Sequence, residues 1–165
     1  MRKIGFILMV SIVAAACNKK PQAPQTVKYV ERDSLSFDVI ADTITYDVII
    51  KNTVITDPVT DEFLRYLDKT SLIDWIFSSV YSGEIIAYDY FSGAVISTDD
   101  LKDIEKSKSF SRESIGKIQF AEAWYYNKEH NIFKKKVISM VLGLEQFNSD
   151  GTLRGYKPVF KLYLN

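Results

Sequence analysis

The carboxyl-terminal part of the chain contains three long stretches rich in β-branched and aromatic residues, at residues 117–126, 132–147 and 156–164. The segment N-K-E-H-N separates the first two stretches, and N-S-D-G follows the second. Both connecting segments consist of residues that favour turns. Short connections of this kind join antiparallel neighbours. The sequence therefore predicts a three-stranded antiparallel meander.

An earlier strand is predicted over residues 35–56, where β-branched residues alternate with polar ones. Because successive side chains of a strand point to opposite faces, Ile44, Tyr46 and Val48 should share one face. We expect a break in this strand near Ala41.

Two helices are predicted next. The first covers residues 60–68, with Thr60 as its candidate cap. The second begins at Ser71, whose spacing to Asp74 is that of a capping box, and ends at Gly83. Its apolar residues point in all directions, which predicts a helix that is buried or contacts a partner.

The middle of the chain predicts short strands at residues 84–90 and 94–97. A polar helix follows, opened by Ser97 and Asp100 and ending near Lys106. The order of elements predicts an α+β fold. In it, a helical hairpin and a short helix pack on an antiparallel sheet that ends in the meander.

The amino-terminal residues 1–16 have the pattern of a secretory signal peptide, with Arg2 and Lys3 before a short apolar run. Three alanines precede Cys17, the single cysteine of the chain, and this resembles the lipobox of bacterial lipoproteins. The resemblance implies that Cys17 carries acyl chains that anchor the protein to a membrane. The alternative is ordinary signal cleavage that leaves a free thiol.

Residues 17–33 are polar and contain two prolines, so we expect a flexible tether, followed by a single domain over residues 34–165. No aspartate follows Cys17, and no acidic run follows it either. By analogy with lipoprotein sorting signals, this favours an anchor in the outer membrane that faces the periplasm.

Charge and motifs disfavour several function classes. The formal net charge is zero, which gives no sign of nucleic-acid binding. His130 is the single histidine and is expected in an exposed turn, so neither a zinc site nor a cofactor is predicted. Asp99, Asp100 and Asp103 are expected to complement a helix dipole, with a cation site as the alternative. We therefore expect that the protein is not an enzyme.

Two glutamates and a lysine run are the remaining polar candidates. Glu122 and Glu145 are expected to point to solvent from strands, the alternative being a carboxylate pair for glycoside cleavage. The lysines at 134–136 are expected to be a solvated strand start, or otherwise a patch for anionic lipid or an acidic partner.

The aromatic run Trp124, Tyr125 and Tyr126 lies in a predicted strand, with the first and third residues on one face. The sheet is either sandwiched between the core and helices or exposed as a subunit interface, where Trp and Tyr are enriched.

Three motifs carry a family resemblance. They are G-E-I-I-A-Y at residues 83–88, I-G-K-I-Q-F-A-E-A-W-Y-Y-N-K-E at 115–129, and G-T-L-R-G-Y-K-P-V-F-K-L-Y at 151–163. In this order they resemble the GldN/PorN family of Bacteroidota, of which the chain would be a short, lipidated, divergent member. The resemblance implies a periplasmic, non-catalytic subunit of the gliding-motility and type IX secretion apparatus. Its partner would be a GldK/PorK-type lipoprotein or another secretion component.

The sequence thus predicts a lipid-anchored assembly or scaffold protein. The candidate partner-binding residues are Trp124, Tyr125, Arg154, Tyr156 and Phe160. Membership of the core is the competing interpretation for each, most of all for Phe160. The alternative function is a small-ligand-binding outer-membrane lipoprotein that holds its ligand in the aromatic sheet.

Overall fold

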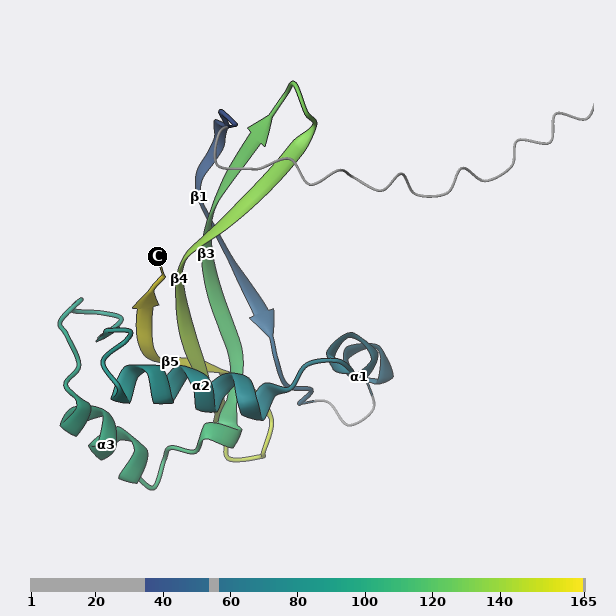
Figure 1. Ribbon diagram of the computed structural model, residues 1–165. Coiled ribbons are helices and arrows are strands. Elements are labelled where there is room, and N and C mark those ends of the chain that lie inside the picture. The colour runs from purple at the N-terminus through teal and green to yellow at the C-terminus, as the bar shows by residue number, and fades with distance from the viewer. Residues whose placement is uncertain (1–34, 54–56, 165) are drawn as a thin grey trace, which may run out of the picture. The chain divides into compact units, whose positions relative to one another are not determined.

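The computed structural model describes residues 35–53 and 57–164 (Figure 1). The predicted signal peptide, Cys17 and the tether lie outside the described residues. The elements in chain order are β1 (Asp38–Ile49), α1 (Pro58–Leu64), α2 (Lys69–Tyr81), β2 (Ala87–Tyr88), α3 (Thr98–Lys106), the 3-10 turn η2 (Arg112–Ser114), β3 (Ile115–Asn127), β4 (Ile132–Phe147) and β5 (Leu153–Tyr163).

The strands form one antiparallel sheet in the order β1-β3-β4-β5-β2. Strands β3, β4 and β5 are consecutive in both the chain and the sheet, which confirms the predicted meander and the α+β class. The strand predicted over residues 84–90 is reduced to the two residues of β2. The strand predicted at 94–97 is a single bridge between Tyr88 and Val95.

Strand β1 has the predicted alternation. Ile44, Tyr46 and Val48 are half-buried, and the residues between them are exposed. The register against β3 shifts on both sides of Ala41, which confirms the predicted break. Such bulges bend a strand and increase its twist.

Helix α1 begins earlier than predicted because Asp57, and not Thr60, is its cap. Asp57 Oδ1 accepts hydrogen bonds from the backbone N–H groups of Val59 and Thr60, at 3.1 and 3.3 Å. Pro58 follows at the start of the helix, where a missing N–H has no effect. None of the residues of α1 is buried, so this helix does not pack into the core.

Helix α2 also begins earlier than predicted. Asp68 Oδ1 accepts from the backbone N–H of Ser71 at 3.0 Å, so the helix starts at Lys69 and Ser71 lies inside its first turn. The predicted end is confirmed, since Gly83 has a φ of 78°, which favours glycine.

One face of α2 is buried, so of the two predictions for this helix burial on every side is wrong, and contact with a partner stays a prediction. Ile73, Ile76, Phe77 and Val80 are buried, whereas Trp75 is 69 % exposed. Helix α2 therefore has more apolar side chains than the core buries.

The core lies between α2 and the sheet. The ring of Phe77 meets that of Phe160 edge-on at 5.3 Å between centroids, and Ile118 and Leu142 join the same cluster. Figure 1 shows α2 crossing the lower half of the sheet. Helix α2, together with Leu101 of α3, therefore covers one face of this part of the sheet.

Helix α3 begins with the predicted capping box, in which Ser97 and Asp100 exchange hydrogen bonds. Arg112 of η2 joins the helices: its Nε lies 2.6 Å from Glu105 Oε1 on α3, and its Nη1 lies 2.7 Å from Asp74 Oδ1 on α2. This clamp orients α3 relative to α2.

Candidate protein-interaction surface

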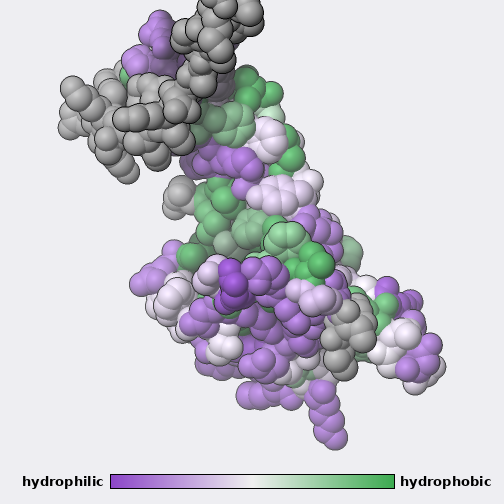
Figure 2. Space-filling view, turned by 90° about the vertical axis from the view of Figure 1, so that its right-hand side faces the viewer, coloured by the Kyte–Doolittle hydropathy of each residue, from purple (hydrophilic) through white to green (hydrophobic). Residues whose placement is uncertain are grey.

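The sheet continues past its helical layer. Along β3 and β4 the core and the side chains packed on it extend no farther than Phe120 and Met140. Residues 121–127 and 132–139, with residues 38–46 of β1, lie beyond it, and we refer to these three segments as the distal sheet. Figure 1 shows them above α2, with none of the helices of residues 57–164 beside them, and Figure 2 shows hydrophobic areas, interrupted by hydrophilic ones, above a largely hydrophilic base. The distal sheet is thus a surface that a partner could cover.

Glu122 lies in the distal sheet with a buried side chain, so the prediction that it points to solvent is wrong. It is on the same face of β3 as Phe120, the face that continues the core. Tyr46 Oη donates to its Oε1 at 2.6 Å, and Trp124 Nε1 donates to its Oε2 at 3.0 Å. Lys135 Nζ lies 3.5 Å from Oε2. Both carboxylate oxygens therefore have partners.

These contacts favour the charged form of Glu122. The hydrogen bond from Tyr46 lowers the pKa of this carboxyl below its usual value, and the contacts from Trp124 and Lys135 act in the same direction against the effect of burial. The same hydrogen bond raises the pKa of Tyr46. At neutral pH the carboxylate is therefore anionic and the phenol keeps its proton.

Aromatic rings surround this carboxylate. Lys135 Nζ lies 4.8 Å from the ring centroid of Trp124 and 5.9 Å from that of Tyr46. Trp124 meets Phe133 edge-on at 5.5 Å, and Phe133 is 48 % exposed. We refer to Tyr46, Glu122, Trp124, Phe133 and Lys135 as the aromatic cluster. Hydrogen bonds to Glu122 and cation–π contacts with Lys135 orient the rings of Tyr46 and Trp124.

The outer edge of β1 is one edge of the distal sheet. Within residues 35–53 and 57–164, β1 pairs with β3 alone and is the edge of the sheet. Val39 and Ile40 are 61 % and 52 % exposed beside it. An exposed edge strand is a template for pairing with another chain, although the bulges at Ala41 interrupt its regularity.

The structure does not bring the five predicted partner-binding residues together. Trp124 belongs to the aromatic cluster, and Tyr125 is half-buried on the opposite face of β3. Arg154 is exposed and Tyr156 half-buried on β5, roughly 30 Å from Trp124 along the ladder at ~3.3 Å per residue. Phe160 is fully buried in the core. Phe160 is therefore a core residue, as the competing interpretation predicted.

Glu145 is also buried, and its predicted solvent exposure is wrong. Lys51 Nζ lies 2.6 Å from its Oε2, while its Oε1 has no hydrogen-bond partner among the residues that the structure describes. The ladder places Glu122 opposite Val137, so Glu122 and Glu145 are roughly 25 Å apart, at ~3.3 Å per residue. Glycosidase carboxylates lie within about 10 Å of each other, so the two glutamates do not form such a pair.

The other polar candidates have local partners. Asp99 and Asp103 form ion pairs with lysines three residues later, and Asp100 closes the capping box of α3. His130 is exposed in the hairpin turn, with Nδ1 3.0 Å from Asn127 Oδ1. The described part of the chain contains no group of three or more His, Cys, Asp or Glu side chains suited to a metal ion.

Of the aromatic cluster only Trp124 was predicted as a partner-binding residue. Tyr46, Glu122, Phe133 and Lys135 were not. Glu122 and Trp124 are two residues apart on one strand, which places both on one face. This spacing is the sequence signal that could have identified Glu122 as part of the cluster. Tyr46 could not be added without the register of β1 against β3, which joins residues far apart in the chain.

The chain matches no protein-family model and no curated protein. The resemblance to the GldN/PorN family therefore rests on the three motifs, which contain β2, β3 and β5 of the one sheet. Among the helices that the structure describes, none has the length and apolar character needed to cross a membrane.

Proposed function

We propose that this protein is a lipid-anchored, non-catalytic assembly protein on the periplasmic face of the outer membrane, related to the gliding-motility and type IX secretion apparatus. In this proposal acyl chains on Cys17 hold it at the membrane, and residues 17–33 provide reach. The distal sheet binds a protein partner of the GldK/PorK type or another secretion component.

The observation that carries this proposal is the aromatic cluster in a part of the sheet that no described helix covers. Trp and Tyr contribute most of the binding energy at many protein interfaces. Here Glu122 holds the indole of Trp124 and the phenol of Tyr46 by hydrogen bonds, at 3.0 and 2.6 Å. Side chains that are already ordered lose less entropy when a partner binds.

A second exposed apolar surface supports an interaction role. Val59, Phe63 and Tyr66 recur at helical spacing along α1 and just beyond its end, and they are 59 %, 81 % and 86 % exposed. A helix this short is marginal without tertiary packing, so contact with a partner would stabilise it.

The experiment is a mild-detergent pull-down of the tagged full chain from native membranes, with Trp124→Ala and Trp75→Ala compared. Trp75 is the matched control, because it is an exposed tryptophan on α2, outside the aromatic cluster. We expect type IX secretion components with the wild type and with Trp75→Ala. We expect recovery to be at least about tenfold lower with Trp124→Ala, since hot-spot truncation typically costs about 2 kcal/mol or more.

Two further measurements make the outcome specific. Thermal unfolding of both variants shows whether the fold is kept, and Cys17→Ala should reduce recovery by removing the anchor. Recovery of the wild type alone, as a monomer, would overturn the assembly role. Equal recovery with Trp124→Ala would place the partner surface elsewhere.

A further inference from the structure

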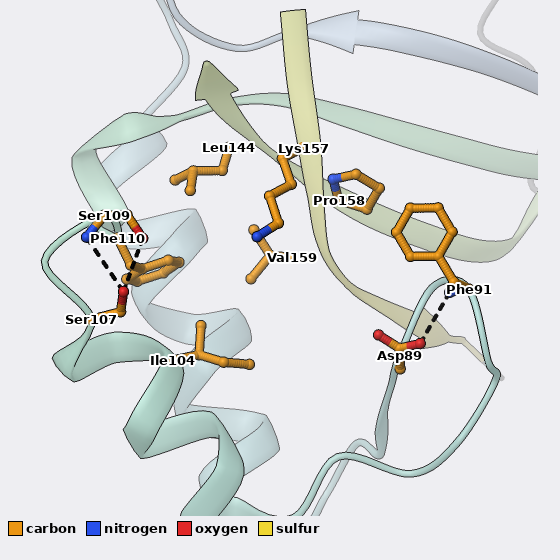
Figure 3. Close-up of a pocket in the computed structure, with 10 residues that line it drawn as sticks. All are labelled: Asp89, Phe91, Ile104, Ser107, Ser109, Phe110, Leu144, Lys157, Pro158 and Val159. Carbon is orange, nitrogen blue, oxygen red and sulfur yellow. Dashed lines mark hydrogen bonds between the residues drawn. The ribbon is translucent and has the colours of Figure 1, made fainter. Parts of the chain in front are cut away.

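A pocket of about 310 Å³ lies at the other end of the molecule, between α3, β5 and the turn after β2. Its apolar lining includes Ile104 of α3, Phe110, Leu144 of β4 and Val159 of β5. Figure 3 shows these side chains around a common space. Both the size and the apolar lining are typical of small-molecule sites.

The ammonium group of Lys157 is one of two charged groups at this pocket. In Figure 3 the Lys157 side chain runs from β5 toward the space between Phe110 and Pro158. Among the residues that the structure describes, no carboxylate forms an ion pair with Lys157. An anionic ligand group could therefore bind it without displacing an internal partner.

The second charged group is the carboxylate of Asp89. Its Oδ1 accepts hydrogen bonds from the backbone N–H groups of Phe91 and Ser92, at 3.2 and 2.7 Å, and from Ser92 Oγ at 2.7 Å. The hydrogen bond from the Ser92 side chain is the main cause that lowers the pKa of Asp89. Its Oδ2 has no partner among the described residues, and Figure 3 shows this oxygen on the side away from Phe91. Asp89 is thus fixed in place with one anionic oxygen free.

We propose that this pocket binds a small zwitterion with an apolar body, such as an apolar amino acid. Its carboxylate would meet Lys157, its ammonium would meet Asp89, and its side chain would lie against Ile104, Phe110 and Val159. The inference is independent of the assembly role, because the pocket is separate from the distal sheet. It also differs from the ligand site expected in the aromatic sheet.

Charge complementarity is the reason to choose a zwitterion. Lys157 is exposed and Asp89 is half-buried, so both charged groups lie at the mouth of the pocket. An apolar anion would pair with Lys157 alone, and an apolar cation with Asp89 alone. A ligand with both charges pairs with both groups, and charge-assisted hydrogen bonds are the stronger kind.

The test is calorimetric titration of the full chain in detergent with L-phenylalanine and L-leucine. N-acetyl-L-phenylalanine lacks the ammonium, and L-phenylalaninamide lacks the carboxylate. We expect 1:1 binding of at least one amino acid. We expect each derivative to bind about tenfold or more weakly, because each loses one charge-assisted contact.

Matched variants locate the site. Lys157→Met should remove the preference for L-phenylalanine over its amide, and Asp89→Asn should remove the preference over the N-acetyl form. Lys136→Met is the control for the lysine, since it lies exposed on β4 in the distal sheet. Asp150→Asn is the control for the aspartate, because Asp150 also accepts from a turn residue two positions later but lies outside the pocket.

Asparagine at position 89 keeps the acceptor that orders the turn, so the fold should be retained, and circular dichroism checks this. No binding of either amino acid overturns the proposal. So does binding that neither pocket variant changes.

Discussion

The indole Nε1 of Trp124 donates a hydrogen bond of 3.0 Å to the carboxylate of Glu122, two residues earlier on the same face of β3. The bond connects a buried charge to a half-buried aromatic ring in the part of the sheet that α2 does not cover. Glu122 therefore links the stability of the distal sheet to the orientation of its candidate binding surface.

Replacing Glu122 by Gln should destabilise the protein at neutral pH by about 1–2 kcal/mol, because neutral hydrogen bonds replace charged ones. The pKa of Glu122 is lower in the folded state than its usual value, so its contribution is present above about pH 4.5. That contribution is lost as the pH falls through the folded-state pKa. Urea unfolding of both proteins at several pH values measures the difference.

The matched control for this prediction is Glu129→Gln, since Glu129 lies exposed in the hairpin turn. Its stability should follow that of the wild type at every pH. The difference in unfolding free energy between the wild type and Glu122→Gln could instead stay constant down to about pH 3, which is below the reference carboxyl pKa. That result would show that the charge of Glu122 does not contribute to stability.

Replacing Phe160 by Ala should cost about 3–5 kcal/mol of unfolding free energy, since it removes a fully buried ring that contacts Phe77. Tyr163→Ala is the comparison, because that ring is 52 % exposed on the same strand and should matter much less. Chemical denaturation measures both. Equal losses would contradict the assignment of Phe160 to the core.

Replacing Gly116 by Ala should destabilise the fold by about 1–3 kcal/mol through overpacking. A Cβ atom there would lie 2.6 Å from Glu145 Oε1 and 2.9 Å from Glu145 Cγ. At Gly143 the nearest atom would be 3.2 Å away, so Gly143→Ala should have a smaller effect. Thermal unfolding of the two variants tests this order, and the reverse order would be inconsistent with the packing described.

Replacing Arg112 by Lys should cost about 1–2 kcal/mol, because an ammonium cannot reproduce the planar fork that contacts Glu105 and Asp74 together. Arg65→Lys is the control, since its pair with Glu62 is exposed and should contribute little. Denaturant midpoints compare the two. An unchanged unfolding free energy in Arg112→Lys would mean that α3 is held by apolar packing alone.

Local sequence signals predicted the elements whose interactions are local. The alternation at Ile44, Tyr46 and Val48 and the capping box at Ser97 were both confirmed. The starts of α1 and α2 were wrong because aspartate competes with Thr and Ser for the cap position. Asp57 and Asp68 each lie three residues before the predicted cap, and both residue types cap well.

Tertiary structure decided which face of each strand and helix is buried and which is exposed. The sequence by itself determined that Glu122, Trp124 and Tyr126 share one face of a strand, because side chains alternate with a period of two. It could not show that Tyr46 of β1 lies opposite and covers Glu122, since strand register depends on contacts between distant residues. The burial of Phe160, the exposure of Trp75 and the pocket beside α3 likewise depend on where α2 and α3 pack. The reason is that packing depends on the combined fit of many side chains from distant parts of the chain. Strand alternation and helix caps depend only on residues close together in the sequence.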